Sequence, residues 1–358
     1  MTGDPSTAAG GPVTAAGPDV RRLSQWLDGH GLLGGSGDLE VNALSGGTQH
    51  ALYELRRGPA RLVLRALPAH ASPDQAQSMM REYRLVRALA DTDVPHARAY
   101  AAAHDPAIAG QPFYVMEKID GWSPPAGQPW PPPFSTDLGA RAGLAMELVD
   151  GIARLARADW QGLDLAGFGR PDGFHDRQVD RWLSFLAAYQ FRELPGLDEA
   201  AAWLRSHRPR SYAPGIMHGD YQFANVMFAH GAPARLAAIV DWEMATIGDP
   251  LLDLGWALIA WPPEGDDMVA ARFVDYAGLP PRDDLLHYYS TVSGRPVQDI
   301  DYYVILARFK LGIVLEKTVA RSRSRTSGPP DPAAELFEAV IGELIRKAAE
   351  LSRQASLA

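Results

Sequence analysis

The residues best suited to chemistry lie in His218-Gly-Asp-Tyr-Gln-Phe-Ala-Asn225 and, shortly afterwards, in Val240-Asp-Trp-Glu243. Asp220 and Asn225 lie on an irregular loop that leads into a short predicted strand, and Asp241 ends the next strand of the same hairpin. Because a hairpin brings its two ends together, we expect Asp220, Asn225 and Asp241 to converge. A carboxylate and an amide oxygen suit Mg²⁺, which leaves the second carboxylate to orient a hydroxyl nucleophile.

Each part of this pattern also has a purely structural interpretation. A His-Gly-Asp sequence is often a turn with a capping aspartate, and Asp-Trp-Glu can simply end a strand. His218 itself favours packing within the loop over shuttling a proton. The combination is far more specific, because the asparagine, the hairpin and Asp-Trp-Glu are followed directly by Gly248-Asp-Pro-Leu-Leu-Asp-Leu-Gly255.

The combined pattern resembles the aminoglycoside phosphotransferase and choline kinase family, whose members share a protein-kinase-like fold. Glycine follows His218 where protein kinases have arginine, and Asp-Trp-Glu stands where they have Asp-Phe-Gly. Within the family, the chain is most similar to the phosphotransferase domains found alone or fused to acyl-CoA dehydrogenases. The resemblance extends from about Leu39 to about Arg321, which is most of the chain.

The resemblance implies transfer of the γ-phosphoryl group of ATP or GTP to a hydroxyl group of a small molecule, with Mg²⁺ as cofactor. Asp220 would be the catalytic residue, and Asn225 and Asp241 would be the metal ligands. Asp253 would brace the catalytic loop by hydrogen bonding to the backbone near His218.

The family also implies a nucleotide site in the N-terminal part of the chain. Ser45-Gly46-Gly47-Thr48 would be the phosphate-covering loop, although alone it is a common hairpin turn. Arg65 stands where most kinase-like enzymes have a phosphate-binding lysine, and Glu82 would fix this cation unless it is a surface residue. The backbone of Glu117 and Ile119 would contact adenine.

The acceptor site is the least specified part of the pattern. The family resemblance places the predicted helix 300–322 on the wall of the acceptor cleft, and we expect Glu243, Arg308 and Arg321 to contact the substrate. The basic residues of this helix favour an anionic or partly apolar hydroxylated compound over a polycationic aminoglycoside. Alternatively, they face solvent on an ordinary amphipathic helix.

The elements that must position these residues are predicted from the hydrophobic pattern. A Gly- and Pro-rich leader at 1–18 precedes a predicted N-terminal lobe at 19–117 and a C-terminal lobe at 118–358. The N-terminal lobe has helices from Asp19 and at 73–91, and strands at 39–44, 51–56, 61–67, 97–103 and 112–117. The C-terminal lobe has one hairpin at 226–229 and 235–240, and helices at about 137–158, 177–190, 197–207, 250–260, 266–277, 282–293, 300–322 and 332–354. This order predicts an α+β, bilobal, protein-kinase-like fold.

The composition of the chain argues against several kinds of partner and site. The 358 residues carry a formal net charge of -9 and contain no cysteine. This acidic balance disfavours nucleic acid and anionic membranes as partners, and the absence of cysteine excludes thiolate metal sites and a cysteine nucleophile. We find no signal peptide and no long apolar run, and expect a cytoplasmic protein.

Two other function classes fit parts of the sequence. A nucleotide-binding pseudoenzyme is favoured by Arg65 and by the plain glycine loop, but disfavoured by the intact Asp220, Asn225 and Asp241. A protein kinase would need a long peptide platform after Asp241, and only Trp242–Gly248 separates it from the next helix start. The sequence therefore favours a small-molecule kinase.

Overall fold

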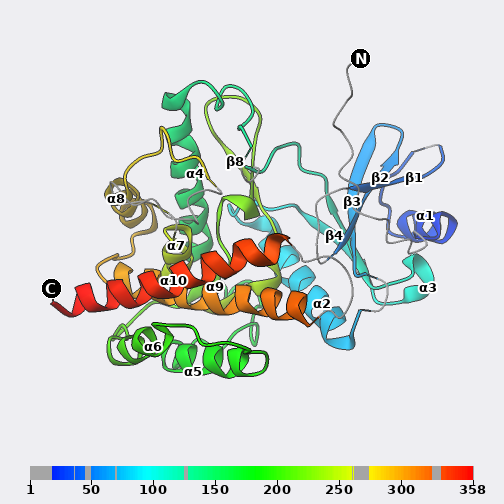
Figure 1. Ribbon diagram of the computed structural model, residues 1–358. Helices are drawn as coiled ribbons and strands as arrows, with labels where there is room; N and C mark the ends of the chain where they lie inside the picture. Colours follow the sequence, from blue (N-terminus) through cyan, green and yellow to red (C-terminus); the bar gives the residue numbers. More distant parts are fainter. Residues whose placement is uncertain are drawn as a thin grey trace, which may run out of the picture. The chain divides into compact units, whose positions relative to one another are not determined.

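The computed structural model describes residues 18–35, 37–44, 50–68, 71–124, 128–259, 261, 274–324 and 332–357 (Figure 1). The chain divides into two compact units. The first unit comprises the residues up to Arg87 together with Arg98–Lys118, and the second comprises Ala88–Ala97 together with the chain from Ile119 onward. Residues 88–97 were predicted to belong to the N-terminal lobe, but they join the second unit because the backbone N–H of Ile239 donates to the carbonyl of Pro95.

The first unit is built on an antiparallel sheet of five strands in the order β1-β2-β3-β5-β4. Its strands are β1 (Glu40–Leu44), β2 (Ala51–Arg57), β3 (Ala60–Ala66), β4 (Ala99–Ala103) and β5 (Phe113–Glu117). Its helices are α1 (Val20–Gly29), α2 (Pro73–Ala88) and the short α3 (Pro106–Ala109). The meander and the helix that follows it were both predicted, and α3 was not.

The core of the first unit forms where α1 packs on the sheet. Leu23 and Leu27 are one helical turn apart, so both point from the same face of α1 and are fully buried. They join Leu64 of β3 and Phe113 of β5 in one hydrophobic cluster. Asp19 caps the helix by accepting hydrogen bonds from two backbone N–H groups of its first turn.

The second unit is mainly helical. Its helices are α4 (Leu138–Arg157), α5 (Phe174–Ala187), α6 (Leu197–Ser206), α7 (Leu251–Ala257), α8 (Arg282–Ser293), α9 (Ile300–Arg323) and α10 (Pro332–Leu357). Two antiparallel pairs of short strands interrupt them: β6 (Gly215–Met217) with β9 (Thr246–Gly248), and β7 (Val226–Phe228) with β8 (Leu236–Ile239). No helix of the described residues is long and apolar enough to cross a membrane.

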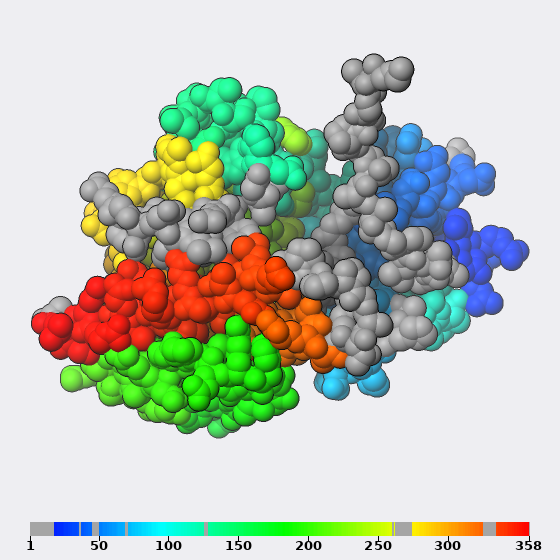
Figure 2. All heavy atoms as spheres, viewed as in Figure 1, coloured from blue at the N-terminus to red at the C-terminus, as the bar shows by residue number. Residues whose placement is uncertain are grey.

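Helix α9 is the central helix of this unit. It packs against α5, α6, α7 and α10, and α10 runs along it on the face seen in Figures 1 and 2. Every residue from Tyr302 to Lys310 is buried, so the amphipathic pattern expected of a surface helix is absent here. Gly255 of α7 makes the approach possible, because a Cβ atom there would lie 2.7 Å from the backbone of Tyr303.

The predicted α+β class is confirmed, with several corrections to individual elements. Helix α5 begins at Phe174 rather than at 177 and ends at Ala187. Of the predicted helix 266–277, the last four residues are not helical and the others lie outside the described residues, as does the predicted leader except for Pro18. Strands β6 and β9 were missed because three-residue strands are too short to show a period.

Candidate active site

Helix α7 holds the loop between β6 and β7 in place through the side chain of Asp253. The carboxylate of Asp253 accepts hydrogen bonds from the backbone N–H groups of His218 (2.6 Å) and Gly219 (2.8 Å), as expected from the sequence. Gly219 has φ of +87°, and a Cβ atom there would lie 2.6 Å from the carbonyl oxygen of Met244. Only glycine therefore suits this sharp turn.

His218 is held in its neutral form by the backbone. It is fully buried, its Nε2 lies 2.8 Å from the carbonyl oxygen of Val240, and its Nδ1 lies 3.3 Å from the backbone nitrogen of Asp220. An imidazole that donates from Nε2 and accepts at Nδ1 satisfies both contacts. Burial lowers the pKa of His218, since it disfavours the charged ring. These contacts support a packing role for His218 and not a proton shuttle.

Asp220 and Asn225 contact each other directly. The Asn225 amide nitrogen donates to the Asp220 carboxylate (2.9 Å) and also to the Asp220 backbone oxygen (2.8 Å). Gln222 donates to the other carboxylate oxygen (2.7 Å), and a side-chain hydrogen bond joins Trp256 of α7 to the same group. Because both donors of the amide point towards Asp220, the Asn225 side-chain oxygen faces elsewhere.

Asp241, which follows β8, is the third residue predicted to converge with Asp220 and Asn225. The backbone N–H of Val240 donates to the Asn225 carbonyl (2.9 Å), which holds the end of β8 beside the catalytic loop. Asp241 itself has φ of 64°, an uncommon value outside glycine. The pKa of Asp220 is raised to about 6, mainly by burial and also by the charge of Asp241, while the hydrogen bond from Asn225 acts in the opposite direction. The structure thus brings together the three residues predicted to converge.

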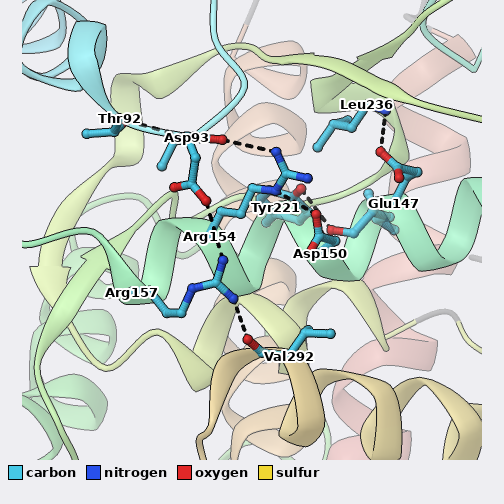
Figure 3. Close-up of polar contacts among 11 residues, drawn as sticks. Thr92, Asp93, Glu147, Asp150, Arg154, Arg157, Tyr221, Leu236 and Val292 are labelled. Carbon is cyan, nitrogen blue, oxygen red and sulfur yellow. Dashed lines mark hydrogen bonds and ion pairs between the residues drawn. The ribbon is translucent and has the colours of Figure 1, made fainter.

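Helix α4 packs against both the loop that carries Asp220 and the hairpin of β7 and β8 (Figure 3). The Tyr221 hydroxyl donates to the carbonyl of Leu148 (2.9 Å), and Glu147 accepts from the backbone N–H of Leu236 in β8 (2.6 Å). Gly151 allows this approach, since a Cβ atom there would lie 2.5 Å from Leu236 and closer still to the Tyr221 hydroxyl. The loop that carries Asp220 is therefore packed on α4.

Two arginines connect α4 to its other neighbours (Figure 3). Arg154 pairs with Asp150 (2.6 Å) and donates to the backbone oxygen of Asp93 (3.2 Å). Arg157 donates to the carbonyl of Val292 in α8 and pairs with the Asp93 carboxylate. These contacts anchor α4 in the second unit independently of the catalytic loop.

In the first unit, the predicted phosphate-binding cation and its acidic partner are paired. Arg65 on β3 lies 3.2 Å from Glu82 on α2, and the Tyr114 hydroxyl donates to Glu82 (2.9 Å). Glu82 is 2% exposed, so the alternative that it is a surface residue is wrong. A buried carboxylate with two partners fixes the direction of the arginine.

The remaining nucleotide-site predictions are placed as follows. Ser45-Gly46-Gly47-Thr48 lies outside the described residues. Glu117 ends β5, where its backbone N–H donates to the carbonyl of Arg98 (2.8 Å). Ile119 lies two residues further on and is the first residue of the second unit after the boundary at Lys118.

The predicted acceptor-site residues occupy different environments. Arg308 is 3% exposed and donates to the carbonyl of Ile259 (2.5 Å), so it links α9 to the end of α7 and does not face solvent. Arg321 is exposed near the end of α9, and Glu243 is half-buried in the short turn after Asp241.

Sequence reasoning missed Gln222 and Trp256 as partners of the Asp220 carboxylate. Gln222 is two residues from Asp220, and nothing in the motif distinguishes it. Trp256 had a usable signal, because it lies three residues after Asp253 and therefore on the same face of α7.

Comparison with known proteins agrees with this geometry. A model of the phosphotransferase enzyme family matches residues 40–287, which is more than half of the chain. The chain therefore belongs to the phosphotransferase enzyme family. Mouse (Mus musculus) acyl-CoA dehydrogenase family member 10 is 28% identical over 299 residues, covering 82% of this chain but only 28% of the mouse protein.

Solved structures show the same fold. A Ralstonia eutropha protein named provisionally as an aminoglycoside phosphotransferase is 27% identical, with a TM-score of 0.80 over 94% of this chain and 99% of that one. Plasmodium vivax ethanolamine kinase is 10% identical, with a TM-score of 0.60 over 89% of this chain and 83% of that one. The predicted kinase-like fold is confirmed by these similarities.

Proposed function

We propose that the protein is a Mg²⁺-dependent small-molecule kinase that transfers the γ-phosphoryl group of ATP or GTP to a hydroxyl group. The arrangement of Asp220, Asn225 and Asp241 carries this proposal, since an amide hydrogen-bonds one carboxylate and the second carboxylate lies within electrostatic reach. Phosphoryl transfer asks the protein mainly to position groups and to neutralise charge.

The donor set fits Mg²⁺. The Asn225 nitrogen is used by Asp220, which leaves the amide oxygen for a cation, and Asp241 offers carboxylate oxygens. The charge of Asp241 also raises the pKa of Asp220, after the larger effect of burial, so a cation held by Asn225 and Asp241 would relieve this repulsion. When bound, Mg²⁺ would neutralise charge on the phosphate oxygens.

Asp220 is the group that would orient the acceptor. An ionised carboxylate accepts a hydrogen bond from a hydroxyl group and can take its proton as the oxygen bonds to phosphorus. The hydrogen bonds from Asn225, Gln222 and Trp256 favour this ionised form and hold the carboxylate in one direction.

Arg65, positioned by Glu82, would bind the phosphate groups of the nucleotide. Arginine is permanently charged and can engage phosphate oxygens with two N–H groups. Glu82 and Tyr114 hold the side chain in a fixed position, which reduces the entropy lost when a phosphate binds.

The acceptor is proposed to be a neutral or anionic hydroxylated compound, such as a hydroxy acid or its thioester. Glu316 is the only acidic residue between Tyr302 and Arg321, and it is fully buried and paired with Arg192 (2.7 Å). Because this carboxylate is buried and already paired, it does not suit the ammonium groups of an aminoglycoside. The acyl-CoA dehydrogenase name of the mouse relative also favours an acyl compound.

The decisive test is turnover of MgATP against a panel of hydroxylated metabolites, with ³¹P NMR of the product and Asp220→Ala as control. A phosphorylated product that depends on Asp220 is expected. If MgATP raises the melting temperature but no compound is phosphorylated, the protein is a nucleotide-binding pseudoenzyme. If a peptide is phosphorylated in preference to all small molecules, it is a protein kinase.

A further inference from the structure

Lys310 lies in the middle of α9, where its side chain contacts both α5 and α7. Its Nζ atom is 5.2 Å from the ring centre of Trp182 on α5 and 5.1 Å from that of Trp256 on α7. Both distances are those of a cation–π contact. Although the residue is only 4% exposed, its ammonium group is therefore held between two indole rings in a defined position.

This position is adjacent to the proposed catalytic carboxylate. Trp256 contacts Lys310 with its ring and Asp220 with a side-chain hydrogen bond, so a single indole connects the two residues. Burial lowers the pKa of Lys310 to about 8, while the charges of Asp253 and Asp220 act in the opposite direction. These two carboxylates therefore favour the charged form of the ammonium group.

Within the described part of the chain, the ammonium group has aromatic partners but no oxygen acceptor. Among the described residues, no side chain or carbonyl accepts a hydrogen bond from Lys310, and both carboxylate oxygens of Asp253 are taken by backbone N–H groups. Its neighbour on α9 differs, since Arg308 donates to the carbonyl of Ile259. An indole ring attracts a cation but accepts no conventional hydrogen bond, so the N–H groups of Lys310 remain able to donate to a further partner.

We propose that Lys310 is a specificity-determining residue of the acceptor site, whose ammonium group donates a hydrogen bond to an acyl oxygen close to the reactive hydroxyl. This role rests on the proposed function, because it assumes that Asp220 orients that hydroxyl. The acyl oxygen can belong to a free carboxylate or to a thioester carbonyl. The half-buried indole of Trp182 supplies apolar surface for the carbon chain beside it.

Lys310 also has an alternative role in which it does not contact the substrate. Lys310 could act only within the protein, as a countercharge for Asp253, which supports the catalytic loop. A lysine with that function would affect every acceptor equally, together with the stability of the fold. A lysine that binds an acyl oxygen would affect only acceptors that carry one.

The test compares the wild type, Lys310→Met and a matched control, Lys317→Met. Methionine keeps the length and the apolar stem of lysine without its charge. Lys317 lies on the same helix and also places its Nζ over an aromatic ring, that of Phe185 at 4.8 Å, but no contact links it to the catalytic loop within the described part of the chain. Rates are measured at saturating MgATP with a hydroxy acid, its thioester, and the corresponding alcohol without an acyl group.

For Lys310→Met, we expect KM to rise about tenfold to a hundredfold for the acyl acceptors, as for loss of a hydrogen bond to a charged group. The free acid should lose more than the thioester if a carboxylate is the partner, and both should lose equally if the partner is a carbonyl. The alcohol, the slow hydrolysis of MgATP and the melting temperature shift caused by MgATP should not change. Lys317→Met should match the wild type throughout.

Equal losses for the alcohol and the acyl acceptors, or loss of MgATP hydrolysis, would overturn the proposal in favour of a structural role. Binding is measured in parallel by thermal shift with the same acyl compounds, because this needs no turnover. Stabilisation of the wild type but not of Lys310→Met, without any phosphoryl transfer, would keep this role while removing the proposed function. If no acyl compound binds or reacts, Lys310 has no such role.

Discussion

Asp253 and His218 are joined by a hydrogen bond of 2.6 Å, in which the backbone N–H of His218 donates to the buried carboxylate of Asp253. The second carboxylate oxygen accepts from the backbone N–H of Gly219. One side chain on α7 therefore fixes two consecutive peptide groups of the loop that carries Asp220. The position of the proposed catalytic residue depends on a residue that need not touch the substrate.

The first prediction concerns this brace. In Asp253→Asn, one of the two acceptor oxygens is replaced by an NH₂ group that faces a backbone N–H group. We expect the free energy of unfolding to fall by about 2 kcal/mol, the usual effect of an unsatisfied buried group, and kcat to fall because the loop loses its position. Urea unfolding and steady-state kinetics measure the two effects. A variant with normal kcat would show that Asp253 is not needed to position the loop.

The second prediction separates chemistry from folding. Asp220→Ala and Asp241→Ala should each abolish turnover, since loss of a general base alone typically costs about 10²–10⁴-fold. Their melting temperatures should stay near that of the wild type, because the repulsion by which Asp241 raises the pKa of Asp220 does not stabilise the free protein. Turnover near that of the wild type in either variant would contradict the proposed roles.

The third prediction concerns nucleotide binding. A ligand that binds only the folded protein stabilises it, by about 2.7 kcal/mol when its concentration is 100 times Kd. MgATP should therefore raise the melting temperature, and EDTA should reduce this effect without unfolding the protein. Glu82→Gln should weaken the shift, since Arg65 loses its charged partner. If millimolar MgATP leaves the melting temperature unchanged, the protein is neither a kinase nor a nucleotide-binding pseudoenzyme.

The fourth prediction concerns pH. Burial, with the charge of Asp241, raises the pKa of Asp220 to about 6, and only the ionised form can accept a hydrogen bond and a proton from the acceptor. Because kcat/KM reports ionisations of the free enzyme, we expect it to decrease as pH falls below about 6 and to be constant just above.

A matched variant gives the direction of this effect. Gln222 donates to the ionised Asp220 carboxylate and lowers its pKa, so Gln222→Leu should raise that pKa and move the loss of activity to higher pH. A shift to lower pH, or none, would show that another group controls the profile. MgATP binding should be the same in the variant, which excludes a general defect.

The motif residues and the type of fold were determined by the sequence alone. Asp220, Asn225 and Asp241 could be selected because a hairpin brings its ends together, and that relationship depends only on local geometry. The contact of Asp253 with the loop that carries Asp220 could likewise be expected, because the resemblance to kinase-like folds places Asp253 behind this loop.

The tertiary structure decided which polar residues are buried and what they contact. The resemblance implied that Glu82 fixes Arg65 but left a surface position open, and the structure decides between the two by burying Glu82 against Arg65 and Tyr114. Helix α9 reads as amphipathic with a basic face, yet Lys310 lies between rings from α5 and α7. Such contacts join residues 17 to 128 positions apart, so no local period records them, and burial by distant segments fixes their environment.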